Sequence, residues 1–147
     1  VVFDAFHYHH WRHRWDSLVS ATAVEGGAPC PYVGAVTQNE GGGWMRNLSM
    51  RTQFVAYDRP RLAAASMLGQ SFPFTRWAAS MRHKDLDNGQ SVLLYTYTFD
   101  VGPRWMAWIV RPFVERIFEY QTRKRFARLR TYLAGNAQEI TRWQQEQ

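Results

Sequence analysis

The chain has 147 residues, of which 46% are hydrophobic and 20% charged, and these values fit one globular domain with a single core. Its single cysteine, Cys30, excludes an intrachain disulfide, and no histidine–cysteine spacing matches a zinc finger. The longest strongly apolar stretch, residues 105–110, is too short to span a bilayer, and no signal peptide is evident. We therefore expect one cytoplasmic domain over residues 1–147.

The formal net charge of +6 raises the question of anionic partners. The 18 basic residues are spread along the chain, and their densest run, Arg123 to Arg125 followed by Arg128 and Arg130, falls in a predicted helix. We interpret that run as a solvated helix face. Nucleic-acid binding is therefore not expected, whereas a transient contact with an anionic membrane surface, to load or deliver a lipid, is consistent with the charge.

Residues 2–20 predict one or two short helices. Phe3 and Phe6, and then Trp11, Trp15 and Leu18, recur at helical spacing. Glycines and prolines over residues 26–31 then mark turns. Beyond these turns the apolar period changes from about 3.6 residues to about 2, so the helices at the start give way to strands.

Six strands are predicted from this alternating pattern. The clearest is the last, in which apolar residues at odd positions from Leu93 to Val101 alternate with mostly polar residues, after a tight turn at Asp87-Asn88-Gly89. Alternation of this kind is typical of an antiparallel sheet with one face in water. The predicted strands are residues 20–25, 33–38, 44–57, 61–69, 75–83 and 91–101.

One long helix is predicted over residues 104–134, where large apolar side chains form a stripe at helical spacing. Pro112 predicts a kink or a separate short helix before the main one, Gly135 predicts a C-terminal cap, and residues 136–147 form a short tail. Because no other stripe can cover the sheet, the predicted fold class is α+β. The stripe consists of Val110, Val114, Phe118, Phe126, Leu129 and Leu133, widened by Met106, Phe113 and Ile117.

Short motifs occur in a characteristic order: Val2-Phe3 with Trp11 and Trp15-Asp16, then Val33-Gly34, Asn88 to Val92, and finally Arg123 to Leu133. In this order they resemble the START-like helix-grip superfamily (SRPBCC), which contains polyketide cyclases, dehydrases and lipid-transport domains. The resemblance implies a curved antiparallel sheet of about six to seven strands wrapped around a long C-terminal helix. It also implies a first strand before Val1, and a cavity that holds an apolar small molecule: a lipid, or a polyketide-like or aromatic compound.

The inward-facing side chains of the sheet and the long helix form the predicted cavity. Tyrosine and threonine hydroxyls among them need partners when buried, and the alanine-rich strand at 61–69 leaves space. A few placed polar groups on apolar walls are typical of ligand pockets, although a solid core fits the same alternation. The predicted cavity residues are Leu48, Met50, Thr52, Phe54, Trp77, Met81, Leu93, Tyr95, Tyr97, Phe99, Phe113 and Ile117.

Acid–base catalysis is the alternative to simple binding, because a cyclase or dehydratase needs a proton donor and acceptor near the substrate carbonyl. Tyr95 and Tyr97 are the candidate catalytic residues, with His10 and His83 as further candidates. The strand patterns yield no inward-facing carboxylate pair. Cys30 lies between two prolines with no base placed beside it, so we do not expect it to act as a nucleophile. A non-binding interaction module is the third hypothesis.

Four histidines lie within residues 7–13. On a helix His9 and His13 are four residues apart, a spacing at which two imidazoles can share a metal ion. His7 and His10 point to a different side, and no carboxylate completes a compact motif. We therefore interpret the histidines as polar, partly exposed helix positions, and we expect no metal and no cofactor.

Overall fold

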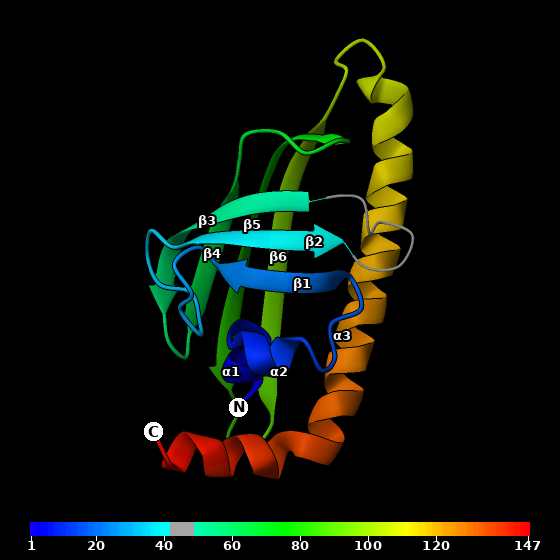
Figure 1. Cartoon of the computed structure of the whole chain (residues 1–147). Helices are drawn as coiled ribbons and strands as arrows, with labels where there is room; N and C mark the ends of the chain where they lie inside the picture. Colours follow the sequence, from blue (N-terminus) through cyan, green and yellow to red (C-terminus); the bar gives the residue numbers. More distant parts are fainter. Residues whose placement is uncertain (42–48) are drawn as a thin grey trace.

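The computed structural model describes residues 1–41 and 49–147, arranged as a sheet with one long helix beside it and two short helices near one end (Figure 1). The short helices come first in the chain, α1 (Val2–His7) and α2 (His9–Arg12). Strands follow, and then helix α3 (Ala107–Gln145). The strands are β1 (Val19–Val24), β2 (Val36–Gly41), β3 (Ser49–Asp58), β4 (Leu62–Leu68), β5 (Phe74–Asp85) and β6 (Ser91–Val101).

The sheet is a meander in which each strand pairs antiparallel with the next along the chain, in the order β1-β2-β3-β4-β5-β6. Side chains alternate as predicted: on β3, Thr52 and Phe54 are buried, whereas Arg51 and Val55 are exposed. Register shifts interrupt the pairings β1–β2, β3–β4 and β5–β6, and such irregularities bend strands. A curved antiparallel sheet followed by a long C-terminal helix confirms the predicted helix-grip class.

Strand boundaries follow backbone conformation more closely than the apolar pattern. The strand predicted at residues 33–38 is β2 at Val36–Gly41, because Gly34 has a left-handed φ of +86° and belongs to the turn before it. Residues 44–48 of the predicted strand 44–57 lie outside the described part of the chain, and β3 covers the remainder. Strands β1, β4, β5 and β6 lie close to their predicted positions.

Helix α3 extends further than predicted at its C-terminal end. It continues past Gly135 to Gln145, so the prediction of a C-terminal cap at Gly135 was wrong and the expected tail is its last turns. Figure 1 shows α3 bending in its orange-to-red part, so that these turns run across the molecule below α1 and α2. Ile140 is fully buried there, and Trp143 packs on Tyr8 with ring centroids 4.7 Å apart. This burial outweighs the cost of about 1 kcal/mol for a glycine inside a helix.

The N-terminal end of α3 also differs from the expectation. Residues 104–106 form turns, and the helix runs without interruption from Ala107 through Pro112, so of the two alternatives predicted at Pro112 the separate short helix is not formed. The hydrogen bond that Pro112 cannot donate would go to the carbonyl of Trp108, in the exposed first turns of α3. Among the described helices, none is both long and apolar enough to cross a membrane.

The main hydrophobic core lies where the N-terminal helices meet the second half of α3. Phe6, Trp11 and Trp15 are buried there against Leu129 and Ile140. The indole Nε1 of Trp15 donates to the carbonyl of Ala5 at 2.8 Å, which satisfies the polar atom of a buried ring. The core therefore gathers at one end of the sheet, and the first half of α3 faces the remainder of the sheet.

Candidate functional site

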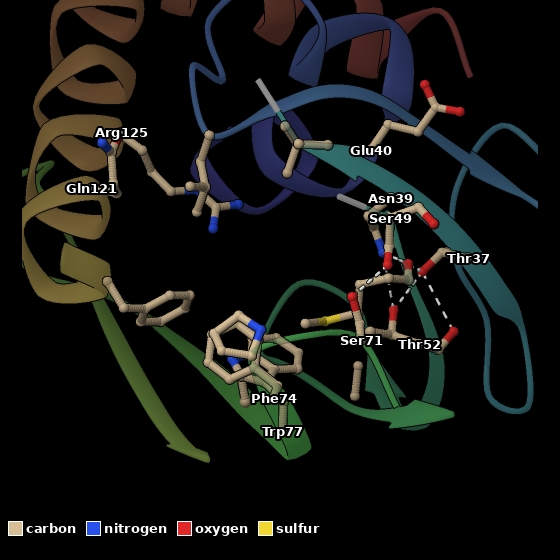
Figure 2. A pocket seen from close by; sticks show the side chains of 18 of the residues that line it. Thr37, Asn39, Glu40, Ser49, Thr52, Ser71, Phe74, Trp77, Gln121 and Arg125 are labelled. Atoms are coloured by element: carbon tan, nitrogen blue, oxygen red, sulfur yellow. Dashed lines mark hydrogen bonds between the residues drawn. The ribbon is translucent and has the colours of Figure 1, made fainter. Parts of the chain in front are cut away.

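A cavity of about 550 Å³ lies between the inner face of the sheet and α3 (Figure 2). The strands supply one wall, α3 supplies the opposite wall, and Phe6 and Arg12 come from the N-terminal helices. Most of the lining is apolar because these are the inward positions of alternating strands and of one helix face. The apolar lining residues are Phe6, Leu18, Val19, Met50, Phe54, Ala65, Phe72, Pro73, Phe74, Trp77, Ala79, Met81, Val110, Val114, Ile117 and Phe118.

Seven of the predicted cavity residues line this cavity: Met50, Thr52, Phe54, Trp77, Met81, Tyr95 and Ile117. Tyr97 and Phe99 share the inner face but pack on Phe118, with ring centroids 4.7 Å and 6.2 Å away. Leu93 packs instead against the core around the N-terminal helices. Leu48 lies outside the described residues.

The prediction that Phe113 faces the cavity was wrong, because its side chain is 64% exposed. Val110, Val114 and Ile117 line the cavity from α3. Successive helix residues are rotated by about 100°, so Phe113 lies well away from the direction in which its neighbour Val114 points. The place of Phe113 at the margin of the predicted apolar stripe suggested an inward position, but the phase of the helix decides which side chain faces the sheet.

A hydrogen-bonded group of polar side chains lies on the sheet side of the cavity (Figure 2). The hydroxyls of Thr37 and Thr52 are 2.6 Å apart, and the amide nitrogen of Asn39 donates to both at 3.3 Å. Thr22 donates to the amide oxygen of Asn39 at 2.8 Å. The inward position of Thr52 was predictable from alternation. Thr37 and Asn39 were missed because their partnership depends on the register that places Thr37 opposite Thr52.

A buried ion cluster involves two arginines that also line the cavity. Oδ2 of Asp16 accepts from Nε of Arg12 and from Nη2 of Arg125, each at 2.9 Å, and Oδ1 accepts from the backbone N–H of Leu18 at 3.0 Å. Burial alone would raise the pKa of Asp16, but the two guanidinium groups outweigh it and hold the pKa below its ordinary value. Both guanidinium groups pack on the Phe6 ring, at 4.8 Å and 4.9 Å from its centroid.

The interpretation of residues 123–125 as a solvated helix face was wrong for Arg125, whose exposure is 4%. Arg123 is exposed and pairs with Glu119 at 2.7 Å, as expected for a solvated face. Arg125 instead follows Gln121 by one helical turn, and both residues line the cavity. The sequence did contain a signal for the inward position of Arg125: it falls on the apolar stripe of the predicted amphipathic helix.

Of the two candidate catalytic tyrosines, Tyr95 lines the cavity and Tyr97 does not. Burial raises the pKa of Tyr95, and Arg125 and Arg12 lie near enough to oppose that shift. Burial also raises the pKa of Tyr97. Both phenols are therefore neutral near pH 7 and can donate a hydrogen bond.

Two of the four histidines are more buried than predicted, whereas His10 and His13 are exposed. His7 and His9 are buried, and burial lowers the pKa of both, that of His9 to about 4. The rings of His9 and His13 stack with centroids 6.5 Å apart. Within residues 1–41 and 49–147, no group of three or more His, Cys, Asp or Glu side chains is arranged to hold a metal ion.

The remaining acid–base candidates lie elsewhere. His83 packs on Phe3 with ring centroids 4.9 Å apart, and His10 packs on Trp143 at 5.3 Å. Neither histidine lines the cavity. Cys30 is a free, half-buried thiol and is also absent from the cavity wall. Acid–base chemistry in the cavity would therefore depend on Tyr95 and Glu40, beside the permanently charged guanidinium groups of Arg12 and Arg125.

The family model described as polyketide cyclase / dehydrase and lipid transport matches residues 1–134. No curated protein matches the sequence. Among solved structures, Ara h 8.0201 is similar with a TM-score of 0.63 and 12% identity, over 92% of this chain and 89% of that one. An uncharacterized protein from Bacillus thuringiensis has a TM-score of 0.57 and 15% identity, over 87% of this chain and 88% of that one. These structures share the fold, and the match over most of the sequence shows that the chain belongs to the polyketide cyclase / dehydrase and lipid transport family of the START-like superfamily.

Proposed function

We propose that this protein binds an apolar small molecule, such as a lipid or a polyketide-like or aromatic compound, in the cavity between the sheet and α3. The observation that carries the proposal is a cavity of about 550 Å³ with apolar walls and polar groups on two sides. Ligand pockets generally have volumes of about 300–1,000 Å³, are mainly apolar and contain a few placed polar groups.

Affinity in such a site comes mainly from removing apolar surface from water, at about 25 cal/mol per Å². Trp77, Phe54 and Phe118 supply large surfaces for this purpose. The side chains of Thr37, Asn39 and Thr52 already hydrogen-bond to one another. A hydrogen bond from this group to a ligand would therefore contribute less to affinity than one from an unpaired donor.

Native mass spectrometry of the purified chain tests the proposal, followed by extraction and identification of any bound molecule. We expect an apolar compound at about one per chain, or uptake of an apolar fluorescent probe by the emptied protein. Ala65→Trp fills the cavity and should abolish uptake, whereas Ala64→Trp, on the neighbouring position of β4 that does not line the cavity, should retain it. A folded protein that is empty and takes up no probe would favour the interaction-module hypothesis.

A cyclase or dehydratase activity is a second candidate, favoured by the position of Tyr95 in the cavity near two guanidinium groups. There its neutral hydroxyl could donate a hydrogen bond to the carbonyl oxygen of a bound substrate. Turnover separates the two candidates, because a carrier returns its ligand unchanged. Tyr95→Phe should abolish product formation with little effect on binding if the activity is present, and Tyr97→Phe is the matched control.

We also propose a transient contact with an anionic membrane surface at the N-terminal end of α3. Trp105 and Trp108 are 75% and 76% exposed, and Phe72 is equally exposed. Arg104 precedes Trp105 directly, and Arg111, which pairs with Asp100 at 3.7 Å, follows Trp108 by three residues. Aromatic rings with arginines suit the boundary of an anionic bilayer, and a cytoplasmic location, consistent with the free thiol of Cys30, would bring such lipids within reach.

Cosedimentation with vesicles tests this contact. Binding is expected to vesicles that contain phosphatidylserine, to weaken with salt, and to be lost on Trp105→Ala/Trp108→Ala. Leu94→Ala, which removes an exposed apolar side chain from β6, is the control and should bind normally. Equal binding to neutral vesicles, or no binding at low salt, would contradict the proposed contact.

A further inference from the structure

We propose that the ligand of this cavity carries an anionic group, in the simplest case a carboxylate, which is received by Arg12 and Arg125. The inference rests on the proposed binding function and narrows the ligand class to an apolar molecule with one acidic end. Both arginines line the cavity, and Arg125 is almost completely buried.

The charge of the cluster is unbalanced. Two guanidinium groups share one carboxylate, that of Asp16, whose oxygens accept three hydrogen bonds from Arg12, Arg125 and the backbone of Leu18. The cluster therefore holds two positive charges against one negative charge. Glu40 also lines the cavity, but Figure 2 shows it on the far side, away from Arg125. A buried excess positive charge is costly in a region of low dielectric, and a ligand anion would neutralise it.

An unused donor strengthens the argument. Nε of Arg125 is buried and has no hydrogen-bond partner among the described residues. Leaving a buried donor of a charged group unpaired is unfavourable, and an anionic oxygen arriving from the cavity is the partner that a guanidinium binds best. Packing on the Phe6 ring and the bond to Asp16 hold Arg125 in place before a ligand binds. Such a preorganised site loses little side-chain entropy on binding.

Neighbouring donors favour the same kind of group. Gln121 lies one turn before Arg125 on α3, and Figure 2 shows both on the helix side of the cavity. Tyr95 lines the cavity near the two arginines and is neutral, so its hydroxyl can donate. A guanidinium, an amide and a phenol therefore lie on one side of a mainly apolar cavity, apart from the hydrogen-bonded group of Thr37, Asn39 and Thr52 on the sheet side. This combination fits an amphipathic acid better than a sterol or a hydrocarbon, which would leave the charge buried and unpaired.

A matched pair of probes tests the inference, dodecanoate and dodecanol, with binding measured by isothermal titration calorimetry at pH 7.5. We expect dodecanoate to bind at least about tenfold more tightly, which corresponds to about 1.4 kcal/mol. Arg125→Met should remove the preference and leave dodecanol binding in place. Arg123→Met, which changes an exposed arginine two residues earlier, should keep it.

Because Arg125→Met removes a buried charge, the variant can fail to fold, so Gln121→Met and Arg125→Lys provide further readouts. The first should weaken the preference for dodecanoate, and the second should retain part of it. If the wild-type protein binds both probes equally, the proposal of an anionic ligand is wrong, while the proposal that the cavity binds an apolar molecule is supported. If it binds neither these probes nor any other apolar compound, the proposed function itself is wrong.

Discussion

Asp16 joins parts of the chain that are far apart in the sequence. Its carboxylate accepts from Arg12, one helical turn earlier, and from Arg125, which is 109 residues later. Through these bonds one residue connects the N-terminal helices to α3 at the edge of the cavity. Because the carboxylate and both guanidinium groups are largely removed from water, each partner depends on the others for neutralisation.

Replacing Asp16 by asparagine is expected to lower the free energy of unfolding by about 3 kcal/mol or more, because two buried guanidinium groups lose their counter-charge. Urea unfolding followed by circular dichroism measures the loss. Glu139→Gln is the matched control: it removes the partner of Arg14 from an exposed ion pair of 3.1 Å and should leave the free energy of unfolding nearly unchanged. Similar effects of the two substitutions would contradict this view of the cluster.

Helix α3 serves two parts of the molecule. Its first half lines the cavity with Val114, Phe118 and Gln121, while its last turns cover the N-terminal helices with Ile140 and Trp143. Cavity wall and core therefore belong to one continuous element. This arrangement explains why the helix does not stop at Gly135, since stopping there would leave α1 and α2 without their apolar cover.

Ile140→Ala tests the contribution of the last turns of α3. The side chain is fully buried, so the substitution removes buried surface and leaves a cavity, with an expected loss of about 2–5 kcal/mol in the free energy of unfolding. Thr141→Ala, at the adjacent exposed position, is expected to change stability by less than about 0.5 kcal/mol. If Ile140→Ala were as mild as Thr141→Ala in chemical denaturation, the tail would not be part of the core.

Over the whole molecule, local periodicity was enough to predict the order of helices and strands, and alternation correctly placed Thr52 and Trp77 on the inner face. What could not be predicted depends on contacts between distant residues. The helical pattern already places Arg125 on the inner stripe of α3, but the counter-charge that allows its burial, Asp16, lies 109 residues away in the chain. The exposure of Phe113 requires the rotation of α3 about its axis. Neither is encoded in the pattern of a single segment, so the polar side of the cavity emerged only from the assembled fold.

A second cluster of titratable groups lies outside the cavity. His7 is buried with its Nε2 unpartnered among the described residues, its ring 6.0 Å from that of His83, whose two ring nitrogens are also buried without partners there. Burial lowers the pKa of His83 to about 4 and that of His7 well below its ordinary value. Together with His9, these side chains are neutral in the folded protein at pH values where the unfolded chain binds protons.

The stability of the protein is therefore expected to fall as the pH decreases from about 6.5 to about 4. Above this window, His7, His9 and His83 are neutral in both the folded and the unfolded state. Within it, unfolding takes up protons, at about 1.4 kcal/mol per pH unit for each proton. Urea unfolding at pH 7.5, 6.5, 5.5 and 4.5 measures the slope. His83→Leu should reduce it, because a leucine neither titrates nor leaves unpaired ring nitrogens behind. A free energy of unfolding that stays constant across the window, or a slope unchanged in His83→Leu, would show that the folded protein accommodates the charged histidines.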